Sequence, residues 1–369
     1  MILILTAGFG DGHNTAARNV AAALTRLAPT SPVQTVDLFD VAHPLLAPVL
    51  KNGYLFLITH LPQVWKWMYG HAGTMKFQPG EQDGLRQLRF AFANTLAQLK
   101  PQAIISTYPL YAQLLESIPM PASVRPPLFT VVTDSISVHP LWALGKSTAH
   151  FVADDQSKES LAKLGVPGAQ IHITGFPVSL DFMELPEAMS DERGSILYLP
   201  STTVGHVRRT LEALRPLIST GTRLTLPLGK HIPRLYQTVT RFIDSLPNAR
   251  IEVIGWTNQI PRLLQTHDLV ICKAGGAILH EALAARCPAI IDCIVPGQEE
   301  GNAELLTSHN CGVISKSPQE SGEIAARLLA HNAAEAKRMS ENARVISEPD
   351  AAVKIAEHVL QIVGIPSLK

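Results

Sequence analysis

A short apolar run that ends in a glycine pair and leads into a helical pattern constrains the fold of this chain most strongly. Residues 269–272 form a brief run without alternation, rich in branched side chains, which is typical of a parallel strand covered on both faces. Gly275 and Gly276 follow, and the missing Cβ atoms let the backbone approach a ligand. The next helix directs its free N–H groups and positive dipole end at the same point. The sequence therefore predicts an α/β protein with an anion site, such as a phosphate site, at this turn.

Two further features extend this candidate site. Glu281 lies about a turn and a half into the predicted helix, where its carboxylate can accept hydrogen bonds from both hydroxyls of a ribose. A glycine pair after a strand is also what an ordinary tight connection looks like. The next connection is more elaborate, because residues 296–303 hold a Pro-Gly turn, three consecutive polar side chains and a Gly-Asn pair. We interpret residues 296–303 as a sugar-binding loop.

Residues 273–288 together with 296–303 resemble the nucleotide-sugar half of the GT-B glycosyltransferases. The likeness is to the branch that contains monogalactosyldiacylglycerol synthases, processive diacylglycerol glucosyltransferases and, more distantly, the bacterial lipid II N-acetylglucosaminyltransferase. The Pro-Gly-Gln-Glu-Glu-Gly-Asn run is the most specific part of the match. The resemblance implies two Rossmann-like parallel-sheet domains that face a cleft, with a C-terminal helix that packs back on the N-terminal domain.

The length of the chain and a polar stretch near its middle indicate where these domains divide. The 369 residues suffice for two domains of ordinary size. An acidic, proline-containing stretch at 185–194 is predicted to link them. We expect an acceptor-binding domain over residues 1–182, a nucleotide-sugar domain over 194–345 and a returning helix within 346–369.

Charge, cysteine usage and hydropathy narrow the function classes. A formal net charge of zero and a pI of about 7.3 remove the general electrostatic case for a nucleic-acid partner. Four cysteines without metal-binding spacing are expected to be free thiols in a reducing compartment. No window approaches the roughly 18 apolar residues that a membrane span needs, and the first apolar run is too short for a signal peptide. We therefore expect a cytoplasmic protein, peripheral on the inner face of the cytoplasmic membrane.

A glycine-rich stretch at residues 6–13 follows the first predicted strand and precedes a helix predicted over 14–27. A dinucleotide-binding turn would require a third small residue where His13 stands, so the spacing argues against that ligand. The stretch resembles the Gly-x-Gly-His entrance of the lipid glycosyltransferases, which implies that Gly10 and Gly12 border the acceptor and that His13 faces it. An imidazole there suits proton transfer. A simple helix cap or a surface side chain is the alternative for His13.

Residues 41–73 are broken by prolines and rich in aromatic side chains that stand beside basic ones. Amphipathic helices of this composition rest in bilayer interfaces. A helical lid with one buried face fits the pattern equally well. The segment also resembles the acceptor side of the diacylglycerol enzymes, which implies peripheral contact with an anionic membrane. The same resemblance implies acceptor contacts from Tyr54, Trp65, Trp67 and Tyr69.

Another candidate site follows the strand predicted at residues 128–132. Asp134 and His139 come soon after that strand, and ligands gather at the carboxyl ends of the strands in a parallel sheet. An aspartate in this position can equally be a turn or helix cap. The Thr-Asp, His-Pro and Trp positions resemble the lipid galactosyltransferase pattern, which implies catalytic roles for both residues.

The second half departs from the family at one loop. The family usually has a glycine-rich loop after the first strand of this domain, but residues 200–206 contain one glycine. This weakens the case for backbone amides that cradle the diphosphate, although the hydroxyls at positions 201–203 can substitute. Elsewhere the resemblance implies that the base lies near Trp256 with backbone hydrogen bonds at Thr257, and that Asn302 belongs to the donor site.

The predicted chemistry is inverting transfer of a hexose from a UDP-sugar to a lipid hydroxyl, with diacylglycerol as the expected acceptor. Either Asp134 or His13 would take the acceptor proton. The helix that starts at Gly276, aided by Lys273 or Lys230, would neutralise the leaving diphosphate. In this scheme the polar loop residues Gln298 and Glu299 would hold the sugar hydroxyls.

No Asp-x-Asp motif occurs in the sequence, so we expect no divalent cation and no further cofactor. Three other functions remain open at this point. A UDP-N-acetylglucosamine 2-epimerase would share the fold but need no acceptor, which leaves the aromatic segment at 53–69 unexplained. A transferase with another lipid-linked or soluble acceptor fits as well. A non-catalytic nucleotide-sugar sensor would account for the altered loop at 200–206.

Overall fold

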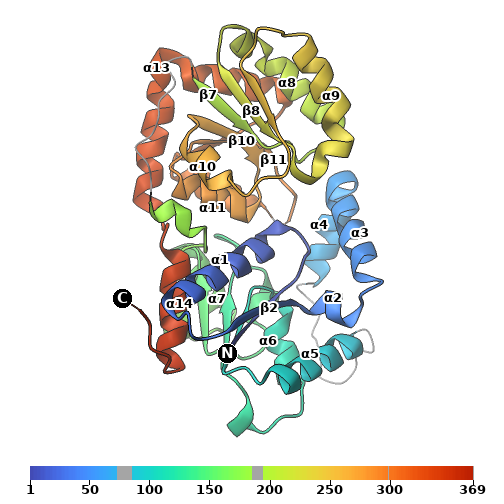
Figure 1. Ribbon diagram of the computed structural model, residues 1–369, viewed down its shortest axis with the longest axis vertical. Coiled ribbons are helices and arrows are strands. Elements are labelled where there is room, and N and C mark those ends of the chain that lie inside the picture. The colour runs from blue at the N-terminus through green and yellow to red at the C-terminus, as the bar shows by residue number, and fades with distance from the viewer. Residues whose placement is uncertain (73–84, 185–193, 298, 369) are drawn as a thin grey trace. The chain divides into compact units, whose positions relative to one another are not determined.

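The structure, a computed structural model, describes residues 1–72, 85–184, 194–297 and 299–368. It divides the chain into two compact units (Figure 1). The first comprises Met1–Leu180, Pro296–Gly301 and Glu348–Lys369, and the second comprises Asp181–Val295 and Asn302–Ser347. The linker predicted at 185–194 lies outside the described residues except for Gly194, and so does the polar stretch at 78–83.

A six-stranded parallel sheet in the order β2-β1-β3-β4-β5-β6 forms the centre of the first unit. Its central strands are short apolar runs that are buried along their whole length, because helices cover both faces. All six strands point the same way, so their carboxyl ends share one edge. The strands are β1 (Ile2–Thr6), β2 (Val33–Asp37), β3 (Ala103–Ser106), β4 (Leu128–Val131), β5 (Ala149–Val152) and β6 (Ile171–Ile173).

The last helix of the chain packs on the first one within this unit (Figure 1). Ile355 and Val359 are fully buried on α14 (Ala351–Ile362), and Val20 and Leu24 are fully buried on α1 (Asp11–Leu27). The other helices of the unit are α2 (Leu38–Ala42), α3 (Ala47–His60), α4 (Pro62–Ala72), α5 (Arg86–Leu99), α6 (Leu110–Glu116) and α7 (Asp155–Lys163).

Helix α1 begins three residues earlier than the sequence pattern predicted. Gly10, with φ 95°, stands at the N-cap, and the helix runs from Asp11. A glycine in the first turn is tolerated, because the first four N–H groups of a helix have no partner within the helix. His13 therefore belongs to the first turn of α1 and not to the preceding loop.

The second unit repeats the architecture with a parallel sheet in the order β12-β11-β10-β7-β8-β9. Ile196, Leu224, Ile271 and Ile290 from four of its strands lie in one buried core. The strands are β7 (Ser195–Tyr198), β8 (Arg223–Pro227), β9 (Ile251–Ile254), β10 (Leu269–Lys273), β11 (Ala289–Cys293) and β12 (Gly312–Ile314). The helices are α8 (Val204–Ser219), α9 (Ile232–Asp244), α10 (Ile260–Gln265), α11 (Gly276–Ala284), α12 (Glu300–Ser308) and α13 (Pro318–Ile346).

Helix α13 is interrupted, since residues 330–333 have non-helical dihedral angles. The sequence pattern likewise predicts two separate helices here, over 323–329 and 333–340. Among the described residues, no helix combines the length and the apolar character that crossing a bilayer requires.

Candidate functional site

His13 lies where the first turn of α1 meets the carboxyl ends of β3 and β4. Its Nδ1 is 3.0 Å from the hydroxyl of Thr133, and its ring meets Tyr108 edge-on with 5.2 Å between the centroids. Burial lowers the pKa of His13 to about 4, against the opposite effect of a backbone hydrogen bond at Thr107. The imidazole is therefore neutral at pH 7, and in this state it is a weak base.

Asp134 holds the loop after β4 through one carboxylate oxygen. Its Oδ2 accepts hydrogen bonds from the backbone N–H of His139 at 3.1 Å and from the indole N–H of Trp142 at 2.8 Å. Among the residues that the structure describes, none donates to Oδ1. Burial raises the pKa of Asp134, and these two hydrogen bonds only partly offset that effect. Because a raised pKa makes a carboxylate a stronger base, Asp134 suits proton abstraction better than His13.

The ring of His139 is occupied on both nitrogens. Its Nδ1 accepts from the backbone N–H of Leu141 at 3.2 Å, and its Nε2 lies 3.1 Å from the carbonyl oxygen of Tyr69, so Nε2 is the donor. The rings of Tyr69 and His139 also approach to 4.3 Å between centroids. The sequence assigned His139 a catalytic role. In the structure the His139 side chain connects the loop after β4 to α4 through these contacts with Leu141 and Tyr69.

The glycine-rich stretch is anchored by an ion-pair network that the sequence analysis missed. The backbone N–H of Gly8 donates to Asp37 Oδ2 at 2.8 Å, and Lys51 Nζ lies 2.7 Å from the same oxygen. Lys51 also pairs with Asp40 at 2.6 Å. Burial alone would lower the pKa of Lys51, but the hydrogen bonds that it donates to Asp37 and Asp40 raise its pKa above the ordinary value. Asp37, the acid expected on a ribose in a dinucleotide fold, instead joins the glycine stretch to α3.

The aromatic residues of the 41–73 segment divide into an inner and an outer set. Tyr54, Trp65 and Tyr69 form a chain of ring contacts, with centroids 5.0 Å apart for the first pair and 5.6 Å for the second. Tyr54 also faces the glycine stretch, since its hydroxyl lies 3.9 Å from where a Cβ on Gly10 would stand, whereas the space beside Gly12 is open. Trp67 belongs to the outer set and is 65% exposed.

An exposed apolar face covers the outside of this segment. Each of its members is more than two-fifths exposed, and Leu45 reaches 91%. Exposed apolar side chains gathered in one segment mark a candidate interaction surface. Lys51, one of the basic residues among these aromatics, pairs with Asp37 and Asp40. The apolar face consists of Val41, Leu45, Leu46, Val49, Leu50, Phe56, Leu61, Val64, Trp67 and Met68.

The glycine turn of the second unit opens α11 at the carboxyl end of β10. Gly275 is the N-cap and Gly276 the first helical residue, and no acidic residue occurs in the first turn. The Lys273 ammonium folds over the turn, 3.7 Å from where a Cβ on Gly275 would stand. Asn302 donates to the carbonyl of Ala274 at 3.1 Å and so ties α12 to the same turn. A helix N-terminus with a lysine beside it is a site for an anion.

The remaining predicted donor residues lie on neighbouring elements. Glu281 is half-buried on α11. Lys230 lies in the 3-10 turn Gly229–His231 after β8, and Trp256, 79% exposed, follows β9 with Thr257. The Thr257 hydroxyl accepts from the backbone N–H of Gln259 at 3.0 Å. Since the sheet is parallel, these residues share the edge at which α11 begins.

Two expected sugar contacts belong to the stretch that follows β11. Gln298 lies outside the described residues, and Glu299 is in the stretch Pro296–Gly301, which groups with the first unit. This loop closes on itself, because the N–H of Gly297 donates to the Glu300 carboxylate at 2.6 Å.

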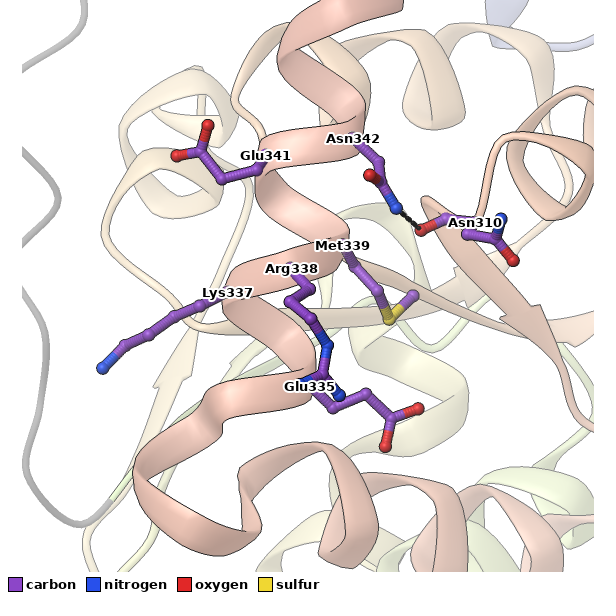
Figure 2. A pocket seen from close by; sticks show the side chains of 7 residues that line it. All are labelled: Asn310, Glu335, Lys337, Arg338, Met339, Glu341 and Asn342. Atoms are coloured by element: carbon purple, nitrogen blue, oxygen red, sulfur yellow. Dashed lines mark hydrogen bonds between the residues drawn. The ribbon is translucent and has the colours of Figure 1, made fainter.

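Other acids and hollows in the molecule have different roles. Asp154, part of the Asp-Asp pair considered for a metal, caps α7 by accepting from the N–H of Ser157 at 2.7 Å. Within the described part of the chain, no cluster of three or more histidine, cysteine, aspartate or glutamate residues is suited to a metal ion. A surface hollow of about 580 Å³ lies beside α13 (Figure 2). None of the predicted site residues lines it, and its lining residues are Asn310, Glu335, Lys337, Arg338, Met339, Glu341 and Asn342.

Comparison with known proteins finds similarity to enzymes that make glycolipids. Residues 13–178 match the model of the monogalactosyldiacylglycerol (MGDG) synthase family. A probable chloroplastic monogalactosyldiacylglycerol synthase from Glycine max is 26% identical over 98% of this chain and 71% of its own length. Processive diacylglycerol β-glucosyltransferases from Staphylococcus epidermidis and Bacillus cereus are 25% and 27% identical, over 98% and 97% of this chain and 93% of their own lengths.

Solved structures support the same fold. MurG from Acinetobacter baumannii superimposes with a TM-score of 0.64 at 15% identity, over 98% of this chain and 99% of its own. The S. aureus MnaA–UDP co-structure gives 0.61 at 13% identity, over 99% and 96%. The chain is thus a glycosyltransferase of the GT-B fold, related over nearly its whole length to the monogalactosyldiacylglycerol synthases and the processive diacylglycerol glucosyltransferases.

Proposed function

We propose that this protein transfers a hexose from a UDP-sugar to the free hydroxyl of diacylglycerol, with inversion at the anomeric carbon. The observation that carries the proposal is Asp134, a half-buried carboxylate with a raised pKa, which lies within the region that matches the MGDG synthase model. The named activities of the relatives supply the donor and acceptor classes.

In the proposed reaction Asp134 Oδ1 takes the proton from the lipid hydroxyl. The hydroxyl oxygen then bonds to the anomeric carbon while the bond from that carbon to the diphosphate breaks, and UDP leaves with the electron pair. Oδ2 keeps its two hydrogen bonds from the β4 loop, so the carboxylate is oriented before the substrate arrives. His13 lines the same end of the sheet, as a neutral donor or acceptor to the acceptor hydroxyl and not as the principal base.

On the donor side, the N-terminus of α11 and Lys273 would stabilise the leaving diphosphate. The N–H groups of a helix start and an ammonium group provide positive charge where negative charge develops during bond cleavage. Glu281 would accept both ribose hydroxyls, and Trp256 would lie against the base. Charge neutralisation by these groups requires no metal ion or other cofactor, which is part of the proposal.

The apolar face would bring the first unit to its acceptor. Diacylglycerol resides in a bilayer, and a monotopic protein reaches it by burying exposed apolar and aromatic side chains in the interface. Trp67 and Phe56 of the apolar face fit that role, since they are among its large exposed aromatics. We propose peripheral binding at the inner face of the cytoplasmic membrane, where UDP-sugars are made.

A panel assay tests the proposal. The protein is incubated with UDP-galactose, UDP-glucose, UDP-glucuronic acid or UDP-N-acetylglucosamine and vesicles that contain diacylglycerol, and lipid products are identified by mass. We expect a product one hexose heavier than diacylglycerol with one of the first two donors. The matched control omits the lipid: interconversion of UDP-sugars in its absence would indicate an epimerase. UDP binding without any product in a single turnover would indicate a sensor and would refute the proposal.

A further inference from the structure

A carboxylate–imidazole pair, Asp292 and His206, lies at the edge of the second sheet where α11 begins. His206, in the first turn of α8, places its Nε2 3.2 Å from Oδ2 of Asp292 on β11. The Asp292 side chain is 2% exposed and that of His206 is 19% exposed. Because a carboxylate only accepts hydrogen bonds, Nε2 carries the proton and Nδ1 remains as the other polar atom of the ring.

A β-bulge aims Asp292 into this position. In the pairing of β10 with β11, Cys272 lies opposite Ile291 and Lys273 lies opposite Cys293, so Asp292 is the extra residue. Bulges redirect a side chain and are frequent beside active sites, and they are rare between parallel strands. Without the extra residue, the regular register would continue to the end of β10.

His206 and Asp292 come from the elements on either side of the anion site proposed at the start of α11. In the sheet order, β10 lies between β7, which leads into α8, and β11. The contact between His206 and Asp292 therefore spans the carboxyl end of β10, where Lys273 and the Gly275 turn follow. Two helix N-termini, those of α8 and α11, meet the sheet at this same edge.

Polar groups buried around the pair lack partners. Oδ1 of Asp292 and the hydroxyl of Thr202, each on a residue more than nine-tenths buried, have no hydrogen-bond partner among the described residues. The hydroxyl of Tyr198 lies near both and is itself a buried polar atom without a partner of good hydrogen-bond geometry among the described residues. Buried polar groups are nearly always paired, so unpaired ones mark a site with a function beyond packing.

We propose that His206, oriented by Asp292, binds the terminal phosphate of the nucleoside diphosphate through Nδ1. This inference rests on the proposed use of a UDP-sugar donor. With the phosphate beside it, the ring takes up one proton from solvent, and Nδ1–H donates a charge-assisted hydrogen bond to a phosphate oxygen. Residues 200–206 contain one glycine, where the family usually has a glycine-rich loop, and the imidazole adds a donor at this place.

Titration calorimetry with UDP and with uridine separates phosphate recognition from recognition of the nucleoside. We expect His206→Ala to weaken UDP binding about tenfold or more, the value of a charge-assisted hydrogen bond, and to leave uridine binding within about twofold. His206→Gln keeps a donor for Asp292 but has no second nitrogen, and it should weaken UDP binding as much as alanine does. Asp292→Asn should produce a smaller loss in the same direction.

The control is His309→Ala, an exposed histidine at the end of α12 whose Nδ1 contacts only its own helix and Ser308. Its UDP affinity should equal that of the wild type. Unchanged UDP affinity in both His206→Ala and His206→Gln would overturn the inference and leave the proposed function intact. Equal losses for UDP and uridine would also overturn it, since His206 would then support the fold or the base. A wild-type protein that does not bind UDP would overturn the proposed function itself, and this inference with it.

Discussion

The two glycine turns that open α1 and α11 look alike in sequence and differ in charge. Both follow a buried strand and lead into a helix at the carboxyl end of a parallel sheet. The first carries an acid, Asp11, in the first helical turn, and Asp37 accepts the N–H of Gly8. The second has no acid in its first turn, and Lys273 lies over it.

This difference teaches that the strand–glycine–helix pattern alone does not specify an anion site. In the first unit, the Asp11 carboxylate lies at the positive end of the helix and Asp37 accepts the N–H of Gly8, which leaves a place better suited to a neutral hydroxyl than to an anion. In the second unit the helix end keeps its positive potential and suits a diphosphate. Four predictions test this difference between the two units.

The largest effect is expected at the acceptor side. Asp134→Asn keeps the size of the side chain and removes the basic oxygen, so turnover should fall roughly a hundredfold or more, the usual contribution of a positioned base. UDP affinity should stay at the wild-type value because the substitution is in the other unit. The measurement is kcat with diacylglycerol vesicles beside calorimetry with UDP. Turnover within a few-fold of wild type would remove Asp134 as the base.

The next largest effect is expected from variants that exchange the charges at the two glycine turns. Gly276→Asp gives α11 an acid in its first turn, as α1 has, and repulsion of the diphosphate should weaken UDP binding by about tenfold. The matched variant, Asp11→Asn, removes the acid from α1 and should leave UDP affinity unchanged. Similar UDP affinities for Gly276→Asp and wild type would contradict the placement of the diphosphate at this helix.

A smaller effect is expected from the anchor of the first glycine turn. Lys51→Met breaks the ion pair with Asp37 that holds Gly8, and the looser loop should lower kcat by several-fold, the order of effect expected when a positioning contact is lost. Asp40→Asn is the control, because Asp40 pairs with Lys51 but does not contact Gly8. Equal effects of the two variants on kcat would show that the ion pairs stabilise α3 only. Vesicle flotation should be unchanged in both.

The smallest effect concerns acid stability and applies to both units. Burial lowers the pKa of His13 and His150 in the first unit, and of His267 and His280 in the second, to about 4 in each case. Between pH 6.5 and 4 the unfolded chain binds protons that the folded chain does not, so the free energy of unfolding falls as the pH is lowered through this window.

Denaturant unfolding at several pH values measures this slope. His13→Gln should reduce the slope by up to one proton while the other three histidines keep theirs. An unaltered slope in His13→Gln would mean that His13 is not buried as a neutral ring.

Much of the fold could be predicted from the sequence because local patterns carry it. The runs at 128–132 and 269–272 form strands, and the glycine pair at 275–276 opens a helix as expected. Boundaries were harder to place. Helix α1 was predicted to start at residue 14 and starts at Asp11. A glycine N-cap and an acid in the first turn outweigh the poor helix propensity of Gly12.

The contacts within the candidate site depend on distant parts of the chain, and no local pattern could reveal them. His13 meets Thr133, and the ring of His139 reaches the backbone of Tyr69. The bulge at Asp292 arises from the pairing of β10 with β11, so the sequence of β11 alone does not reveal it. Asp37 and Lys51 are 14 residues apart in the sequence, and no local pattern indicates that they form an ion pair.

The contact between α1 and α14 has a consequence for how the protein is made. The ribosome delivers residues 348–369 only after every residue of the second unit, although those residues form part of the first. Helix α1, which carries His13 in its first turn, therefore keeps one side uncovered until residues 348–369 have been made. Premature termination anywhere in the second half would leave a polypeptide with exposed apolar surface on α1. Such partial products should be targets for chaperones and proteases.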